Sequence, residues 1–244
     1  MRVSSCLVVA VALAILQGAH TKAASRPQPI DYVIFIDQTG SVSAEQRQAW
    51  ATTATDVLKQ LTVSDSILIL PVHDRTLDAA PLFFARVPAG GLSLEDMAFA
   101  KRSLKETRQA ARASVHEALT SRKQASSTQL LTVIDRLAAA RSAQPGRIMR
   151  AYLFSDMVNS TPDLDMERRR LVSAEIPQLV GKIRNDARWR DGALAGVKVF
   201  CVLNGIDTGQ RATNDRRVLH EFWRAVFTAV GAELETFETH LAQE

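Results

Sequence analysis

Short apolar runs alternate with longer amphipathic stretches along most of this chain. Each apolar run is bounded by turn residues and predicts a buried strand. The runs are 32–36, 66–72, 82–87, 148–154, 197–203 and 234–237. Between them, apolar residues at helical spacing predict helices over 44–61, 93–122, 129–140, 166–184 and 215–230. This alternation predicts an α/β fold, a doubly wound and mainly parallel sheet flanked by helices on both faces.

Polar residues mark where several of these helices begin and end. Ser43 stands where the N-cap of the first helix is expected, and Ser93 with Asp96 makes a capping-box signal for the second. Pro145 and Gly146 end the third helix. The helix over 93–122 is long and highly charged. We interpret it as an amphipathic helix with a solvated outer face, and the alternative is an arm that binds a partner.

The first residues have the layout of a secretory signal. Arg2 precedes an apolar run over 6–16, and small and polar residues follow it. We expect residues 1–24 to be a signal peptide cleaved after Ala23 or Ala24, and residues 25–244 to form a single domain. The alternative is a retained amphiphilic anchor. The run is shorter than the roughly 18 residues that cross a bilayer as a helix, so we expect an exported protein, periplasmic or extracellular, without a permanent membrane span.

Charge and cysteine content narrow the class of protein further. Removal of the signal leaves 28 basic against 26 acidic residues, a balance that does not call for nucleic acid as a partner. Cys201 is then the single cysteine, and it lies in an apolar run. A buried, reduced thiol is expected, and the stability of the fold has to come from its core.

One loop carries the residues that point most clearly to chemistry. Asp37, Thr39 and Ser41 put one carboxylate and two hydroxyls on alternate residues after a predicted strand, and Gly40 permits the turn. Asp156 follows another predicted strand. Ligands of parallel sheets bind beyond the carboxyl ends of strands. Oxygen donors around two acids suit Mg²⁺ or Mn²⁺ better than zinc, which prefers His or Cys.

At these positions the sequence resembles the von Willebrand factor A family. Its metal-ion-dependent adhesion site reads D-x-S-x-S, then a Thr in a later loop, then an Asp after a further strand. The matching residues here are Asp37, Thr39, Ser41, Thr128 and Asp156, and the similarity in element order covers nearly the whole predicted domain. Met157 departs from the pattern, since a Gly commonly follows the last Asp.

The resemblance implies a binding protein that is not an enzyme. It implies one bound Mg²⁺ or Mn²⁺ with an open coordination position. A Glu or Asp carboxylate of a protein partner would occupy that position.

Two other classes of function compete with this interpretation. The loop that begins at Asp37 also resembles the phosphorylation loop of haloacid-dehalogenase phosphotransferases, in which Asp37 would be the nucleophile. Gln38, however, stands where those enzymes have a lysine, and the loop at Asp156 has a single acid. Binding of nucleic acid or an acidic surface through the basic residues of 168–190 is the third hypothesis, but acidic residues are interleaved with them.

Overall fold

The structure is a computed structural model that describes residues 28–39, 42–121, 125–162, 164–185, 192–203, 210–239 and 241; for 210–214 it describes the backbone alone. The expected signal peptide and Ser41 lie outside the described residues.

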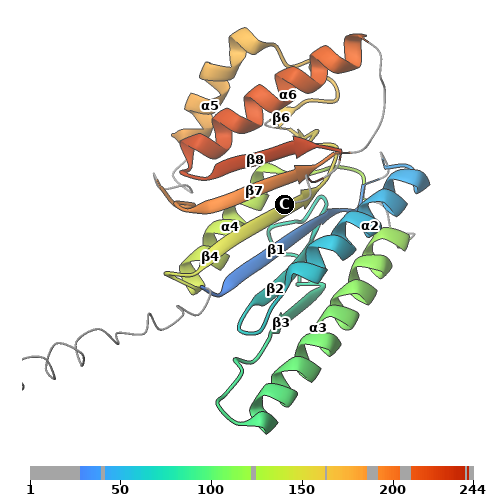
Figure 1. The fold of residues 1–244 in the computed structure, drawn as a ribbon. Coiled ribbons are helices and arrows are strands. Elements are labelled where there is room, and N and C mark those ends of the chain that lie inside the picture. Colours follow the sequence, from blue (N-terminus) through green and yellow to red (C-terminus); the bar gives the residue numbers. More distant parts are fainter. Residues whose placement is uncertain are drawn as a thin grey trace, which may run out of the picture.

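The domain is built on a six-stranded sheet with the order β3-β2-β1-β4-β7-β8 (Figure 1). Pairing is parallel except between β2 and β3, which form a hairpin. The strands are β1 (Ile30–Asp37), β2 (Ser66–Val72), β3 (Phe83–Arg86), β4 (Ile148–Phe154), β7 (Val197–Val202) and β8 (Glu233–Glu238). All six predicted strands are therefore confirmed: the ends of β2 and β4 are as predicted, and the other four differ by one or two residues at one or both ends.

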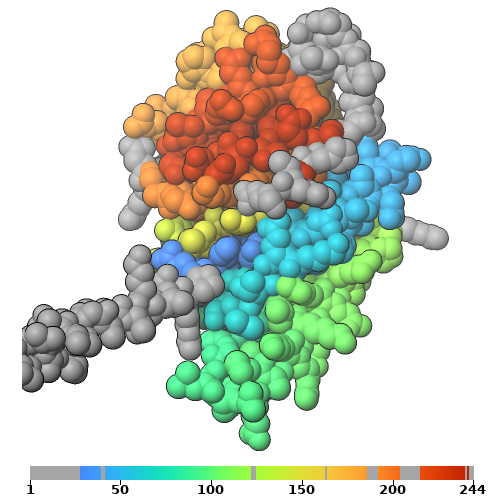
Figure 2. Space-filling model, in the orientation of Figure 1, coloured from blue at the N-terminus to red at the C-terminus, as the bar shows by residue number. Residues whose placement is uncertain are grey.

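Helices cover both faces of the sheet, which confirms the predicted doubly wound α/β class. α2 (Ala44–Gln60) and α3 (Leu94–Thr120) lie side by side on one face (Figures 1 and 2). α4 (Leu131–Ala143), α5 (Ile176–Arg184) and α6 (Gln210–Ala229) pack with the opposite face. The alternation of side chains in β1 divides the core accordingly. Tyr32, Ile34 and Ile36 face α2 and α3, whereas Val33 and Phe35 face α4 and α6.

The helix predicted over 166–184 is wrong in its first half. That half contains a 3₁₀ turn (Ser173–Glu175), and it is preceded by a two-stranded ribbon of β5 (Ser160–Thr161) and β6 (Leu164–Asp165). α5 begins only at Ile176, with Pro177 in its first turn. Proline has no N–H to donate and is accommodated at a helix start, so it marks where this helix can begin.

Two N-caps were predicted and both are present, although one is incomplete. The Ser43 hydroxyl accepts the Gln46 N–H, and the Gln46 side chain in turn accepts the Ser43 N–H, which makes a full capping box. Ser93 accepts the Asp96 N–H alone. The shorter Asp side chain does not complete the reciprocal bond that Glu or Gln can make.

Cys201 is fully buried in β7 and forms no disulfide, as predicted. Burial raises the pKa of its thiol far above the ordinary value because a thiolate would be desolvated there. In the described part of the chain, no helix combines the length and apolar character that crossing a membrane requires.

Candidate functional site at the switch point of the sheet

The candidate site lies where the winding of the sheet reverses. β1 is flanked by β2 on one side and by β4 on the other, so the chain leaves the two central strands in opposite directions along the sheet. Ile36 pairs with Phe154, and Asp37 and Ser155 come next on each strand. Parallel α/β sheets bind ligands at such a topological switch point, beyond the carboxyl ends of the strands.

Asp37 places a buried carboxylate at this point. The side chain is 4% exposed, and its Oδ1 accepts the Thr39 N–H at 2.9 Å and the Thr39 hydroxyl at 2.7 Å. Its Oδ2 accepts the Ser155 hydroxyl at 2.6 Å. Burial raises the pKa of Asp37 more than these hydrogen bonds lower it. No basic side chain of the described residues forms an ion pair with it, so within this part of the chain its negative charge is stabilised by the dipoles of these hydrogen-bond donors.

The Asp37 loop is fixed to its neighbours on both sides. The Gln38 N–H donates to the Val72 carbonyl at 3.0 Å, and the Gln38 carbonyl accepts the Ala125 N–H at 3.1 Å. Thr39, which is 6% exposed, forms an isolated parallel bridge with Ala125. This bridge brings the segment that leads to Thr128 beside the first loop.

Thr128 is buried and joined to the loop that follows β4. Its N–H donates to the Ser160 hydroxyl at 2.8 Å, and its carbonyl accepts the Ser160 N–H at 3.0 Å. Thr128 itself is 3% exposed. The loop that precedes α4 and the loop that follows β4 are therefore joined by hydrogen bonds beyond the carboxyl end of β4.

Asp156 sits in a tight turn directly after Ser155. Its Oδ1 accepts the Val158 N–H at 2.9 Å. Met157 adopts the left-handed conformation, with φ of 63°, at the position where the resembled family commonly has Gly. For a residue with a Cβ, this backbone conformation is less stable than the right-handed one by about 1–2 kcal/mol. The fully buried Met157 side chain and the bond from the Trp223 indole N–H to the Met157 carbonyl, at 2.9 Å, hold the turn in place.

The structure thus brings Asp37 and Thr39 into direct contact and places Thr128 and Asp156 on the two adjoining loops. Sequence reasoning missed three residues that hold these loops: Ser155, Asn159 and Ser160. All three lie between β4 and the end of β5. Their signal was visible as a run of polar residues after a predicted strand, but their partners became clear only from the fold.

Oxygen donors of this kind fit a small, hard cation. Asp37 Oδ2 accepts one hydrogen bond and keeps a second lone pair, and a hydroxyl that donates its proton also keeps lone pairs for a metal ion. Mg²⁺ sites commonly use one or two carboxylates and several waters. No group of three or more His, Cys, Asp or Glu side chains in the described part of the chain is arranged to hold a metal. A site here would rest on hydroxyls as well as on two carboxylates.

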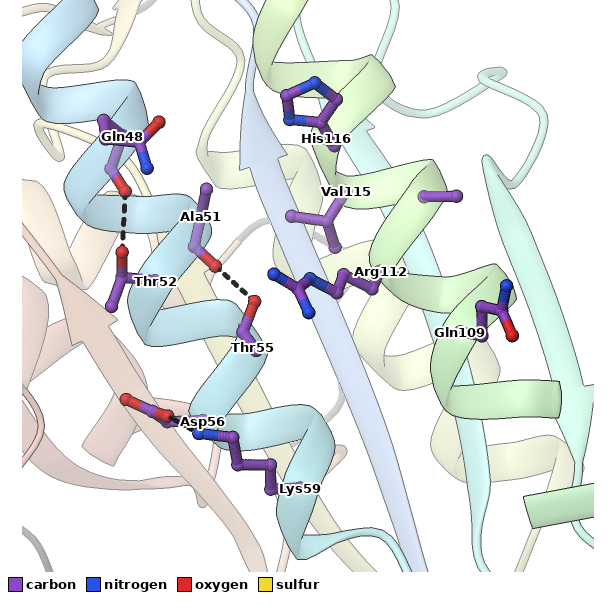
Figure 3. Close-up of a pocket in the computed structure, with 11 residues that line it drawn as sticks. Gln48, Ala51, Thr52, Thr55, Asp56, Lys59, Gln109, Arg112, Val115 and His116 are labelled. Carbon is purple, nitrogen blue, oxygen red and sulfur yellow. Dashed lines mark hydrogen bonds and ion pairs between the residues drawn. The ribbon is translucent and has the colours of Figure 1, made fainter. Parts of the chain in front are cut away.

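A hollow of about 550 Å³ lies between α2 and α3, and none of the candidate site residues lines it (Figure 3). The Thr52 and Thr55 hydroxyls donate to backbone carbonyls of their own helix, those of Gln48 and Ala51. Asp56 is ion-paired with Lys59 at 2.8 Å. These polar groups already bond within α2, so the switch point remains the stronger candidate site.

Fold and site together define a doubly wound α/β domain with an oxygen-lined candidate site at its switch point. No protein-family model matches the chain, and no curated protein does. Among solved structures, the chain is similar to a von Willebrand factor type A protein from Catenulispora acidiphila, with 13% identity, a TM-score of 0.47, and coverage of 86% of this chain and 38% of that one.

Two further similar structures are the manganese-loaded TRAP protein of Plasmodium vivax and the pilus adhesin SpaC of Lactobacillus rhamnosus GG. The first has 11% identity and a TM-score of 0.43 over 88% of this chain and 68% of that one. The second has 13% identity and a TM-score of 0.46 over 86% of this chain and 28% of that one. Similarity at such low sequence identity concerns the fold alone. The function of this chain therefore has to be inferred from its own residues.

Proposed function

We propose that this chain is an exported binding protein of the von Willebrand factor A type. In this proposal Asp37, Thr39, Ser41, Thr128 and Asp156 hold one Mg²⁺ or Mn²⁺, directly or through water. The cation supplies an electrophilic position that a Glu or Asp carboxylate of a protein partner can occupy. No catalytic step is part of the proposal.

The single observation that carries the proposal is the state of Asp37. A carboxylate that is 4% exposed, lies at the switch point and receives only hydroxyl and amide hydrogens has no cationic partner in the described residues. Buried charges in proteins are generally paired or coordinate metals. A divalent cation would neutralise Asp37 and Asp156 together.

The residues have separable roles under this proposal. Asp37 supplies charge, and Ser155 and Thr39 orient its two oxygens through the hydroxyl bonds at 2.6 and 2.7 Å. Thr128 and Ser160 couple the other two loops. The Asp37 carboxylate is therefore already oriented before a cation binds, which limits the entropic cost of binding.

The phosphotransferase alternative is not favoured. The Gln38 side chain, in the position where such enzymes have a lysine, donates to the Ala118 carbonyl at 3.4 Å. Asp37 has both oxygens engaged and is almost fully enclosed, whereas a nucleophile must reach its substrate.

Retention of partners on the immobilised protein tests the binding function. Envelope proteins of the exporting cell should be retained in Mg²⁺, released by chelator and displaced by a soluble acidic peptide. The Thr39→Ser variant keeps a hydroxyl and should retain the same proteins. Retention that persists in chelator would contradict binding through a cation.

A further inference from the structure

Another cavity, of about 530 Å³, lies next to the candidate site. Four elements form it: the loop after β2, the first turn of α4, the β5–β6 ribbon and α5. Its aliphatic lining consists of Leu77, Leu131, Leu164, Leu179 and Ile183. All of these except Leu77 pack against the core cluster that includes α4 and α6.

The cavity shares its wall with the loops of the candidate site. Gln129 and Thr161 line it, and they directly follow Thr128 and Ser160, the two residues that bond to each other. Neighbouring Cα atoms are about 3.8 Å apart. The cavity is therefore close enough to the site to receive a side chain of the partner that lies beside the partner's cation-bound carboxylate.

Asn159 fixes this shared wall. Its Oδ1 accepts the Leu130 and Leu131 N–H groups at 2.9 and 3.3 Å. Its Nδ2 donates to the Thr161 hydroxyl at 2.9 Å and to the Leu164 carbonyl at 2.7 Å. Asn159 is fully buried, and both its amide oxygen and its amide nitrogen have hydrogen-bond partners. This one side chain therefore joins the start of α4 to the β5–β6 ribbon.

The charges around the cavity point to an uncharged occupant. Among the described residues that line the cavity, two basic ones, Arg75 and Lys182, are balanced by two acidic ones, Asp74 and Asp78. A balanced rim does not select a charged group, whereas aliphatic walls gain free energy by burying apolar surface. Ligand pockets of about 300–1,000 Å³ are typically lined in this way, with few polar groups.

We infer that this cavity binds an aliphatic side chain, such as Leu or Ile, that lies beside the acidic residue of the partner. This inference rests on the proposed function, because the cation of that function would position the acidic residue of the partner. The cavity would then give the binding its specificity. The partner's recognition segment is then an acidic residue with an aliphatic neighbour, and the pocket distinguishes it from other acidic segments.

Two series of acetylated peptide amides test this inference: Gly-X-Asp-Gly and Gly-Asp-X-Gly, with X as Leu, Ala or Lys. In Mg²⁺ the wild-type protein should bind the Leu peptide of at least one series about tenfold more tightly than the Ala peptide, because more apolar area is buried. Leu77→Ser should reduce this preference to about twofold or less. Leu77 is 44% exposed, so the substitution leaves the core intact.

Leu82→Ser is the matched control, since Leu82 is 37% exposed and does not line the cavity. It should keep the full preference for Leu. Equal Mg²⁺-dependent binding of all peptides, or a preference unchanged by Leu77→Ser, would overturn the pocket and leave the proposed function intact.

A measurement without metal separates the two claims. N-acetyl-leucinamide, added in chelator, should shift the methyl NMR signals of Leu131 and Leu179 in the wild type and not in Leu77→Ser. If these shifts appear while no peptide binds in Mg²⁺, the pocket stands and the proposed function fails. If neither is seen, both are overturned.

Discussion

Buried polar residues hold the two ends of β1 in different ways. At its start, Asp31 Oδ1 accepts the Arg147 guanidinium and the Ser66 hydroxyl, both at 2.6 Å. At its end, Asp37 is equally buried, but from the described residues it receives only hydroxyl and amide hydrogens. The first arrangement includes a structural ion pair with Arg147, although Asp31 Oδ2 has no hydrogen-bond partner among the described residues. The second leaves a charge for which a cation is the fitting partner.

Arg147→Ala should destabilise the fold by about 3 kcal/mol. The substitution leaves Asp31 buried without its charge partner, and breaking one side of a buried pair commonly costs about 3–5 kcal/mol. It also removes the bond from Arg147 to the Ser64 carbonyl at 2.9 Å. Chemical denaturation of the variant and the wild type measures the difference.

Arg168→Ala is the control for this ion pair. Its side chain is 90% exposed, and its contact with Asp165, at 3.5 Å, is with a partner that is itself partly exposed. Surface pairs contribute about 0–1 kcal/mol. An equal loss of stability in the two variants would show that the Asp31 pair has no special structural role.

At the scale of elements, α4 is capped from outside its own sequence. Its N-cap residue, Leu130, has no side chain that can accept a hydrogen bond, and the Asn159 amide oxygen accepts the N–H groups at the helix start instead. The helix and the loop after β4 are therefore positioned by the same residue. α2, in contrast, carries its own cap at Ser43.

Asn159→Ala and Ser43→Ala should separate local capping from support of the site. Ser43→Ala removes a local cap and should cost about 1 kcal/mol, with metal binding unchanged. Asn159→Ala leaves buried N–H and C=O groups unpaired, at about 1–3 kcal/mol for each group, and should also weaken metal binding. Denaturation and metal titration of both variants check this. Unchanged metal affinity in Asn159→Ala would contradict the positioning role.

The elements that were predictable from sequence are those with a strong local signal. The strand and loop at Asp37 have both an apolar run and a polar motif, and Ser43 has its partner three residues away. The ribbon of β5 and β6 has two residues in each strand, too few for a hydrophobic period, and was missed. Asn159 was missed because its partners at Leu130 and Leu131 are 29 and 28 residues distant. Hydrogen bonds between residues this far apart in the sequence depend on the tertiary fold, so no local pattern of residues predicts them.

At the scale of the whole molecule, strand order decides where the site lies. Because β1 and β4 are neighbours in the middle of the sheet, residues far apart in the chain meet at the carboxyl ends of these two strands. The aliphatic cavity lies beside these strand ends, so charge recognition and apolar recognition would act on one ligand segment.

Export makes a separate prediction for the whole chain. Arg2 and the apolar run over 6–16 predict cleavage by a signal peptidase, so the mature protein should begin at Ala24 or Ser25. N-terminal sequencing of the protein purified from the envelope or medium checks this. Soluble cytoplasmic protein that still begins with Met1 would contradict both export and the proposed location.

Calorimetric titration with Mn²⁺ of the wild type and of the Asp37→Asn and Asp31→Asn variants measures whether Asp37 holds a cation. Both acids are 4% exposed and lie on β1, but at opposite ends of it. We predict one ion bound per wild-type chain, the same affinity in Asp31→Asn, and a loss of at least about tenfold in Asp37→Asn, equivalent to about 1.4 kcal/mol. Absence of binding to the folded wild type, or wild-type affinity in Asp37→Asn, would contradict this prediction.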